Sequence, residues 1–176
     1  MFTLVLLACA FVPMAFEARL AARHDRALRA AGAVEPGNDV FPLMQWAYPL
    51  AFLGMGWEAW ARGAQAHVVF LAGLALFGLA KAIKYWAIAT LGSRWTFRVL
   101  VPPDSSRVTT GPYRFMNHPN YLGVVGEIAG MALMAQAPIA GSVSVIVFGV
   151  LIVKRIRVEE GALAGTRGVA ARDSSC

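Results

Sequence analysis

Five apolar segments separated by polar stretches set the pattern of this chain. They cover residues 2–16, 41–57, 67–88, 121–136 and 139–153. Several approach the ~20 residues that a helix needs to cross the hydrocarbon layer of a bilayer. Pro138 separates the last two segments, and because proline interrupts a helix, we count two helices there instead of one. The pattern predicts an all-α integral membrane protein with about five transmembrane helices.

The polar stretches between these segments predict smaller elements. We expect an amphipathic helix at the membrane surface over 19–31, a turn over 32–39, and mostly loop over 92–120. A charged helix is predicted to start at Lys154, after the fifth apolar segment. The chain is thus expected to form a single domain over 1–164, followed by a flexible tail over 165–176.

Composition supports the membrane assignment and excludes other classes. The 176 residues are 58% hydrophobic and 15% charged, whereas soluble domains carry about 25% charged residues. The net charge of +6 is scattered between apolar segments, which argues against nucleic-acid binding and favours contact with anionic membrane lipids. Cys9 and Cys176 have no spacing typical of a disulfide framework or a metal site. We therefore expect no metal and no nucleic-acid partner.

The distribution of basic residues predicts the orientation. If five helices cross the membrane and the N-terminus lies outside, Arg62 is the only Lys or Arg on the outer side. Such an excess of cytoplasmic positive charge is the usual signature of membrane topology. The prediction is an integral protein, of the bacterial inner membrane, with the N-terminus outside and the C-terminus in the cytoplasm.

The stretch 111–123 is the first candidate for chemistry. Tyr113, His118, Asn120 and Tyr121 crowd the point where the chain enters the fourth apolar segment. A helix N-terminus there offers free N–H groups to a carboxylate, which favours a small-molecule site. The alternative is an ordinary helix start in which His118 caps the helix or faces water.

Two further groups of charged residues are candidates. Arg155 and Glu159 share one helical face, where they could pair or hold a zwitterionic ligand, although an ordinary interfacial helix explains them as well. Glu127 falls inside the fourth apolar segment, where a carboxylate costs roughly 2.5–3.5 kcal/mol. It either has a functional role or pairs with Lys81 or Lys84. Glu58 is expected to be a solvated residue at the membrane interface.

The order of three motifs resembles a known family. Thr110–Arg114, then His118–Gly123, then Arg155, Glu159, Glu160 and Leu163 after an apolar hairpin are similar to the isoprenylcysteine carboxyl methyltransferase family of membrane enzymes. The similarity covers about 94–163. The segment 94–101 is most similar to bacterial members thought to O-methylate long-chain alkylpyrones or other phenolic lipids.

The resemblance implies an S-adenosylmethionine site at the cytoplasmic face, formed by the loop before the fourth helix and the helix after the fifth. Arg155 would hold the oxygen of the acceptor. Where the acceptor needs a base, the candidates are His118, Glu127 and Glu160. The family usually has arginine at the position of Asn117, and Arg114 could supply that charge. The residues that would line the cofactor are Val108, Tyr113, His118, Pro119, Asn120, Tyr121 and Glu159, with residues 105–107 nearby.

The acceptor implied by the resemblance is a lipophilic small molecule that enters from the bilayer. It would be an isoprenylcysteine carboxylate or an alkylpyrone or phenolic lipid. A rival reading is an NADPH-dependent membrane sterol-type or ene reductase, since those enzymes also have a His-Pro-Asn-Tyr turn before a late helix. They would have Glu where this chain has Val124, which argues against that reading. A third reading is a non-enzymatic membrane protein of the same fold.

Overall fold

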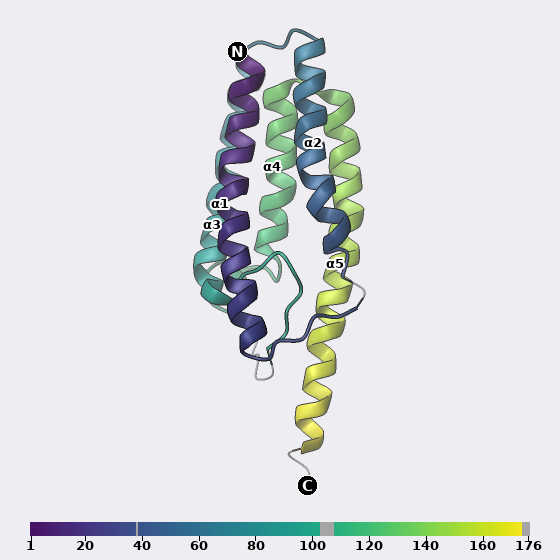
Figure 1. The fold of residues 1–176 in the computed structure, drawn as a ribbon. Helices are drawn as coiled ribbons and strands as arrows, with labels where there is room; N and C mark the ends of the chain where they lie inside the picture. Colours follow the sequence, from purple (N-terminus) through teal and green to yellow (C-terminus); the bar gives the residue numbers. More distant parts are fainter. Residues whose placement is uncertain (38, 103–107, 174–176) are drawn as a thin grey trace.

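The protein folds as an all-α bundle (Figure 1). The structure is a computed structural model that describes residues 1–37, 39–102 and 108–173, with side chains described as far as Gly161. Within these ranges the chain forms five α-helices and two short 3-10 helices, η1 and η2, and its single β-type contact is an isolated bridge between Val34 and Val101. The α-helices are α1 Phe2–Ala30, α2 Phe41–Ala61, α3 Val68–Leu91, α4 Pro119–Ala135 and α5 Pro138–Asp173; the 3-10 helices are η1 Gly92–Arg94 and η2 Gly111–Arg114. The predicted all-α class is confirmed.

Among the described residues, three helical stretches are long and apolar enough to cross a membrane. They are Phe2–Ala30, Val68–Arg94 and Pro138–Gly161. By contrast, α4 has only 17 residues, and α2 contains Pro42, Gln45 and Pro49, which lower its apolar character. The structure thus supports three of the five predicted crossings by length and composition. The remaining two crossings and the orientation of the termini stay predictions.

Two predicted boundaries are wrong. The separate surface helix expected over 19–31 is the continuation of α1, which runs without a break to Ala30. No glycine or proline lies between Phe16 and Arg19 to interrupt it, and Gly32, with φ +83°, follows its end. Similarly, the charged helix expected from Lys154 is the continuation of α5, which reaches Asp173. The helix therefore extends into the expected tail, whose last three residues lie outside the described ranges.

Close contact between α3 and α4 holds the centre of the bundle. A Cβ atom at Gly130 would lie 2.7 Å from the backbone nitrogen of Phe77, and one at Gly73 would lie 2.6 Å from that of Met134. Small residues of this kind let two helix backbones approach each other. Apolar side chains from the other helices complete the core, among them Leu6 of α1, Phe52 and Met55 of α2, and Phe148 of α5.

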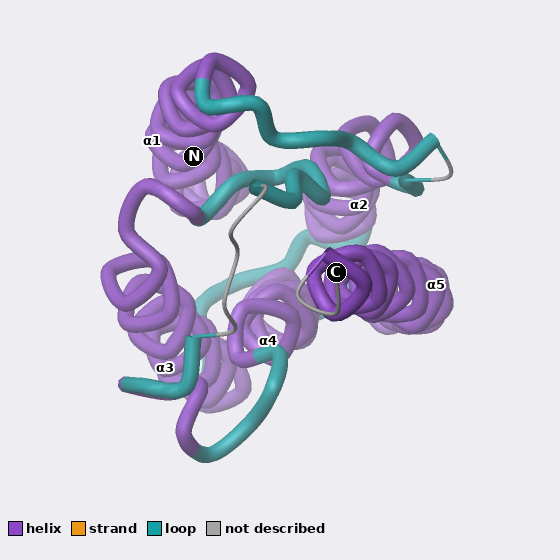
Figure 2. Tube along the Cα trace, turned by 90° about the horizontal axis from the view of Figure 1, so that it is seen from below, coloured by secondary structure: helices purple, strands orange, loops and turns teal. Residues whose placement is uncertain are grey.

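One end of the bundle carries the long connections. Viewed from that end, the segment after α1 and the segment after α3 run across the end of the bundle (Figure 2). The bridge between Val34 and Val101 ties these two segments together, with N–H···O distances of 3.0 Å in both directions. In Figure 1 the C-terminal half of α5 extends beyond the bundle at the same end. The residues from the three motifs meet here.

Candidate functional site

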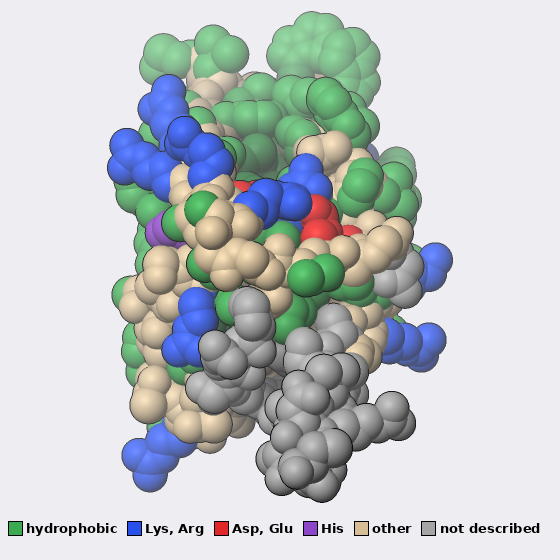
Figure 3. Space-filling view, turned by 60° about the horizontal axis from the view of Figure 1, so that its bottom comes forward, with side chains coloured by type: hydrophobic (Ala, Val, Ile, Leu, Met, Phe, Trp, Pro, Cys, Tyr) green, Lys and Arg blue, Asp and Glu red, His purple; other side chains and the backbone are tan. Residues whose placement is uncertain are grey.

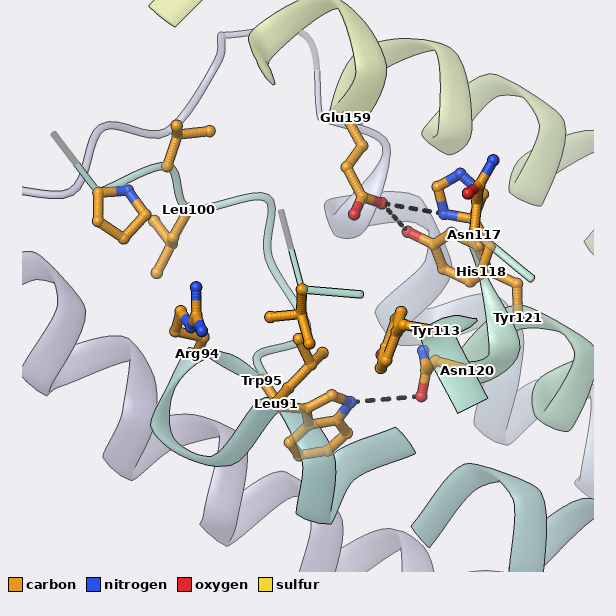
Figure 4. Close-up of a pocket in the computed structure, with 13 residues that line it drawn as sticks. Leu91, Arg94, Trp95, Leu100, Tyr113, Asn117, His118, Asn120, Tyr121 and Glu159 are labelled. Atoms are coloured by element: carbon orange, nitrogen blue, oxygen red, sulfur yellow. Dashed lines mark hydrogen bonds and ion pairs between the residues drawn. The ribbon is translucent and has the colours of Figure 1, made fainter. Parts of the chain in front are cut away.

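A cavity of ≈ 170 Å³ lies at this end of the bundle, between the segment after α3, the start of α4 and the extension of α5. Figure 4 shows its lining with the polar side chains turned toward one another. In the space-filling view of this end, Lys and Arg side chains lie beside a small group of acidic side chains (Figure 3). The lining residues are Leu91, Arg94, Trp95, Leu100, Val101, Pro102, Val108, Tyr113, Asn117, His118, Asn120, Tyr121 and Glu159.

Local backbone features bring the loop to this position. Pro119 occupies the start of α4, where its fixed φ suits a helix and its missing N–H costs nothing. Gly111 begins η2 with φ +55°, and a Cβ atom there would lie 2.4 Å from Oγ1 of Thr90. Only glycine fits that turn against α3 without strain. His118, Asn120 and Tyr121 therefore project from the first turn of α4 into the cavity.

Tyr121 connects two charged residues of α5, Arg155 and Glu159. Its hydroxyl accepts a hydrogen bond from Nε of Arg155 at 2.9 Å and donates one to Oε2 of Glu159 at 2.8 Å. The ring of His118 stacks on the ring of Tyr121 with centroids 5.5 Å apart. Nδ1 of His118 lies 3.9 Å from Glu159, and Nε2 lies 3.4 Å from Glu160. These groups of α4 and α5 thus form one polar cluster.

Trp95 fixes the opposite wall of the cavity. Its indole N–H donates to Oδ1 of Asn120 at 3.3 Å, and its side chain is 2% exposed. Nδ1 of His24, from α1, lies 2.7 Å from the carbonyl oxygen of Trp95. Asn120 is therefore held in one orientation by a residue 25 positions earlier. The sequence pattern gave no sign of this contact.

Tyr113 lines the cavity beside this cluster. Burial raises the pKa of its phenol above the usual range, and the nearby negative charge of Glu159 raises it further. The group remains a neutral hydroxyl at physiological pH and can donate a hydrogen bond. Asn117 also lines the cavity, whereas Arg114 does not and lies over the ring of Phe115 at 5.9 Å. The arginine that contributes to the lining is Arg94.

A second, apolar cavity of ≈ 310 Å³ lies between α1, α2, α4 and α5, and we refer to it as the apolar chamber. It shares Asn120 and Tyr121 with the first cavity, so the two cavities meet at the first turn of α4. Lys84 and Arg155 are the charged residues in its lining. The other residues that line it are Met14, Ala18, Phe41, Met44, Gln45, Tyr48, Pro49, Phe97, Val124 and Phe148.

Comparison with known proteins now decides the family. The profile of the isoprenylcysteine carboxyl methyltransferase (ICMT) family matches residues 72–165. The chain belongs to the ICMT family. The match begins in α3 and ends in α5, so it contains every residue of the first cavity. The family and the three apolar helices together indicate an integral membrane protein and, in general terms, a membrane methyltransferase.

Two relatives cover almost the whole chain. A Bacillus subtilis (strain 168) protein that bears the name "Uncharacterized protein YpbQ" is 33% identical over 159 residues, which is 90% of this chain and 95% of the relative. A Haemophilus influenzae (strain ATCC 51907 / DSM 11121 / KW20 / Rd) protein named "Uncharacterized protein" is 25% identical over 165 residues, 93% of this chain and 96% of the relative. No solved structure shows significant similarity. These relatives extend the likeness to α1 and α2 without naming a substrate.

The structure brings together most residues that the ICMT resemblance pointed to. Six of the seven expected cofactor contacts line the first cavity, and the seventh, Pro119, is buried directly beside them. Glu160 does not line the first cavity, but it contacts His118, which does. Arg155 lines the apolar chamber. Residues 105–107 lie outside the described ranges. The six that line the cavity are Val108, Tyr113, His118, Asn120, Tyr121 and Glu159.

Glu127 is located differently from the other candidates. Its carboxylate accepts a hydrogen bond from the hydroxyl of Tyr48 and lies 3.0 Å from Nζ of Lys81 and 3.2 Å from Nζ of Lys84. It lines neither cavity. Of the two readings that the sequence left open, this geometry favours the pairing between helices. Glu58 also differs from expectation: it accepts hydrogen bonds from the N–H groups of Ile139 and Ala140 and caps α5.

Proposed function

We propose that this ICMT-family protein is an S-adenosylmethionine-dependent O-methyltransferase that acts on a lipophilic acceptor at the membrane. The first cavity has both apolar and polar lining, and we call it the polar cavity because it holds the charged and hydrogen-bonding side chains of the site. One observation carries the proposal: this polar cavity and the apolar chamber meet at Asn120 and Tyr121. Methyl transfer between a water-soluble cofactor and a lipid needs two sites of opposite character that share one boundary. The rate enhancement of such reactions comes mainly from aligning the acceptor oxygen with the methyl group. The reacting atoms would therefore meet at the wall that the two cavities share.

The residues of the polar cavity fit S-adenosylmethionine. Glu159 offers a carboxylate to a cationic group, while Asn117, Asn120 and Tyr113 offer hydrogen bonds to amino-acid and ribose groups. Trp95 and Leu91 supply apolar surface, which suits a purine ring. The cavity of ≈ 170 Å³ is smaller than the roughly 300–1,000 Å³ of whole drug-sized sites. The described residues would thus hold part of the cofactor.

The chemistry follows from this arrangement. S-adenosylmethionine supplies a methyl group on a sulfonium sulfur, so that the sulfur–methyl bond breaks as the new oxygen–methyl bond forms. Arg155 and Tyr121, fixed at the boundary of the two cavities, would position the acceptor oxygen. A carboxylate acceptor needs no base. With a hydroxyl acceptor the proton must leave, and Nε2 of His118, 3.4 Å from Glu160, is the base candidate that lines a cavity.

The apolar chamber favours a lipid-like acceptor. Its volume of ≈ 310 Å³ and its aromatic and aliphatic lining suit part of an isoprenoid or alkyl chain. Two acceptor classes fit, an isoprenylcysteine carboxylate and an alkylpyrone or phenolic lipid. Helices that border the chamber also carry exposed apolar side chains, among them Leu50 and Leu53 of α2 and Val147 of α5. A lipid acceptor could therefore reach the chamber from the bilayer without passing through water.

The first test is cofactor binding by the purified protein in detergent. Isothermal titration calorimetry should show binding of S-adenosylmethionine and none of NADPH. The variants His118→Ala and Glu159→Ala should each weaken S-adenosylmethionine binding at least about tenfold, since each removes a polar partner from the cavity. Tight NADPH binding, or no heat with S-adenosylmethionine, would contradict the proposal.

A control variant and a transfer assay complete the test. The control is Arg62→Ala. Arg62 lies at the opposite end of the bundle and its side chain is 54% exposed, so this variant should bind S-adenosylmethionine like the wild type. Transfer of a labelled methyl group is then measured to N-acetyl-S-farnesylcysteine and, in parallel, to a long-chain alkylpyrone. Labelling of the first assigns a carboxylate acceptor, and labelling of the second assigns a hydroxyl acceptor.

A further inference from the structure

Asp39, in the segment between α1 and α2, has an unusual set of partners. Its side chain is 4% exposed. Oδ1 accepts hydrogen bonds from the backbone N–H of Phe41 at 3.1 Å and from Nη1 of Arg155 at 3.3 Å. Oδ2 accepts from the backbone N–H of Val99 at 3.0 Å. One carboxylate thus joins the start of α2, the segment after α3, and an arginine of α5 that is 116 residues away.

Helix capping alone does not explain this arrangement. The N-cap of α2 is Val40, and a side chain that only satisfies the first N–H group of the helix needs the contact with Phe41 and no other. The other contacts bury a complete ion pair, since Arg155 is 5% exposed. A buried pair of this kind contributes little to stability compared with apolar residues of the same volume. The position of this ion pair beside the proposed site therefore suggests that Asp39 fixes the orientation of Arg155.

Arg155 is held from three directions. Nε donates to the hydroxyl of Tyr121, Nη2 donates to the carbonyl oxygen of Phe97, and Nη1 donates to Asp39. The described residues therefore engage three of its five N–H groups. Arg155 lines the apolar chamber. It also bonds to Tyr121, which lines both cavities.

Without Asp39 the guanidinium would have a competing partner. Glu159 lies four residues after Arg155 on α5, and side chains at that spacing pair readily on a helix. In the structure Glu159 bonds to Tyr121 and faces the polar cavity instead. A direct pair between Arg155 and Glu159 would neutralise the carboxylate that is proposed to meet the cationic cofactor. Asp39 satisfies the charge of Arg155 and leaves Glu159 available.

We propose that Asp39 is a positioning residue for methyl transfer: it holds Arg155 at the boundary of the two cavities and keeps it from pairing with Glu159. This inference rests on the proposed function, because it assigns Glu159 to the cofactor. It assigns a role to the segment between α1 and α2, which lies outside the part of the chain that the family profile matches.

The test is a double-mutant cycle on the full-length protein in detergent, with the dissociation constant for S-adenosylmethionine as the readout. Asp39→Asn keeps the shape and an oxygen for Phe41 but removes the charge, and should weaken binding about tenfold. In the background of Arg155→Gln, which removes the competitor for Glu159, the same change should alter the affinity less than twofold. Residues that act through each other give this non-additive result.

Glu35→Gln is the matched control. Glu35 belongs to the same segment but pairs with Arg29 and Arg98, so its loss should leave the affinity unchanged. Equal tenfold losses for Asp39→Asn in both backgrounds, or no loss in either, would overturn the role of Asp39 while leaving the proposed function intact. Absence of binding by the wild type would overturn both. If Asp39→Asn does not fold, Asp39→Ser, which keeps a side-chain oxygen near the N–H of Phe41, replaces it in the cycle. Failure of both variants to fold would show a purely structural role and overturn the proposal.

Discussion

The hydroxyl of Tyr121 is the smallest unit on which the site depends. It joins Arg155 and Glu159, and the ring carrying it contacts both cavities and His118. Tyr121→Phe keeps the ring and removes the oxygen. Because Arg155 and Glu159 would each lose a hydrogen bond, we expect S-adenosylmethionine affinity to fall about tenfold or more, measured by calorimetry. The stacking with His118 should keep the fold intact.

Tyr85→Phe is the control for that variant. Tyr85 also belongs to a helix of the bundle, α3, but it lines neither cavity. Loss of the Tyr85 hydroxyl should leave the affinity for S-adenosylmethionine unchanged. An equal loss of affinity in both variants would mean that Tyr121→Phe acts by disturbing the whole bundle and not by removing a contact in the cavity.

At the scale of single residues the sequence was informative only over short distances. Tyr113, His118, Asn120 and Tyr121 were identifiable because they lie within nine residues of one another in the sequence. The contact between Asp39 and Arg155 spans 116 residues, and no local pattern reports it. Asp39 follows a Pro-Gly pair and looks like part of a turn in the sequence. Its role depends on which helices become neighbours.

At the scale of helices, the packing of α3 on α4 can be tested with two glycines, Gly130 at the contact and Gly78 away from it. Gly130→Ala would bring a Cβ atom to 2.7 Å from the backbone nitrogen of Phe77, a contact that requires the helices to separate. At Gly78 of α3 a Cβ atom would meet nothing within 4 Å. Overpacking of this kind typically costs about 1–3 kcal/mol, whereas alanine in an open helix position is favourable by up to about 1 kcal/mol.

We therefore expect Gly130→Ala to lower the midpoint of thermal unfolding in detergent and Gly78→Ala to leave it equal or higher. Tryptophan fluorescence can follow the transition. A midpoint for Gly130→Ala at or above that of the wild type would mean that the two helices can separate at little cost. In the sequence both glycines lie inside apolar segments, and only the structure distinguishes them.

Helix boundaries show the limit of pattern reading at this scale. The apolar pattern located all five helices, but it placed breaks in α1 and α5 where polarity changed. Polarity reports the surroundings of a helix, whereas its end depends on backbone features such as Gly32. The consequence matters for the site, because Arg155 and Glu159 belong to the same rigid helix as Phe148 in the apolar chamber.

The segment between α1 and α2 gives a prediction with a pH dependence. Burial raises the pKa of Glu35, but hydrogen bonds from Arg98 and Arg29 outweigh it, and the pKa is lowered from 4.5. A carboxyl group with a lowered pKa stabilises the fold above its unfolded value, and that contribution disappears as the pH falls through the folded value. Glu35→Gln should thus lower the unfolding midpoint at pH 7, and the difference from the wild type should vanish well below pH 4.5.

High salt should also reduce this difference, because Glu35 and its partners are partly exposed and exposed charges are screened. Thermal unfolding at a series of pH values between 3 and 8 measures the effect. A difference between wild type and variant that stays constant across this range would show that the carboxylate charge of Glu35 does not stabilise the segment.

At the scale of the whole molecule, polar contacts inside the bundle hold the helices in register. Glu17 of α1 and Glu127 of α4 bind Lys81 and Lys84 of α3 at 2.6–3.2 Å. The hydroxyl of Tyr48 adds α2 to this group. The fifth helix, α5, is held at its start by Glu58 and near its middle by Arg155. Apolar packing alone would leave sliding between membrane helices inexpensive, because lipid and side chains are equally apolar.

Charge balance in that buried group gives the last prediction. Two carboxylates face two ammonium groups, and the side chains of Glu17, Lys84 and Glu127 are at most 3% exposed. Lys84→Met would leave two buried carboxylates with one cation, which typically costs about 3–5 kcal/mol. Adding Glu127→Gln restores the balance, so the double variant should unfold at a higher temperature than the single variant. Lys154→Met, on the exposed surface of α5, is the control and should unfold like the wild type. If instead the double variant is less stable than Lys84→Met, individual hydrogen bonds and not net charge hold the four helices together.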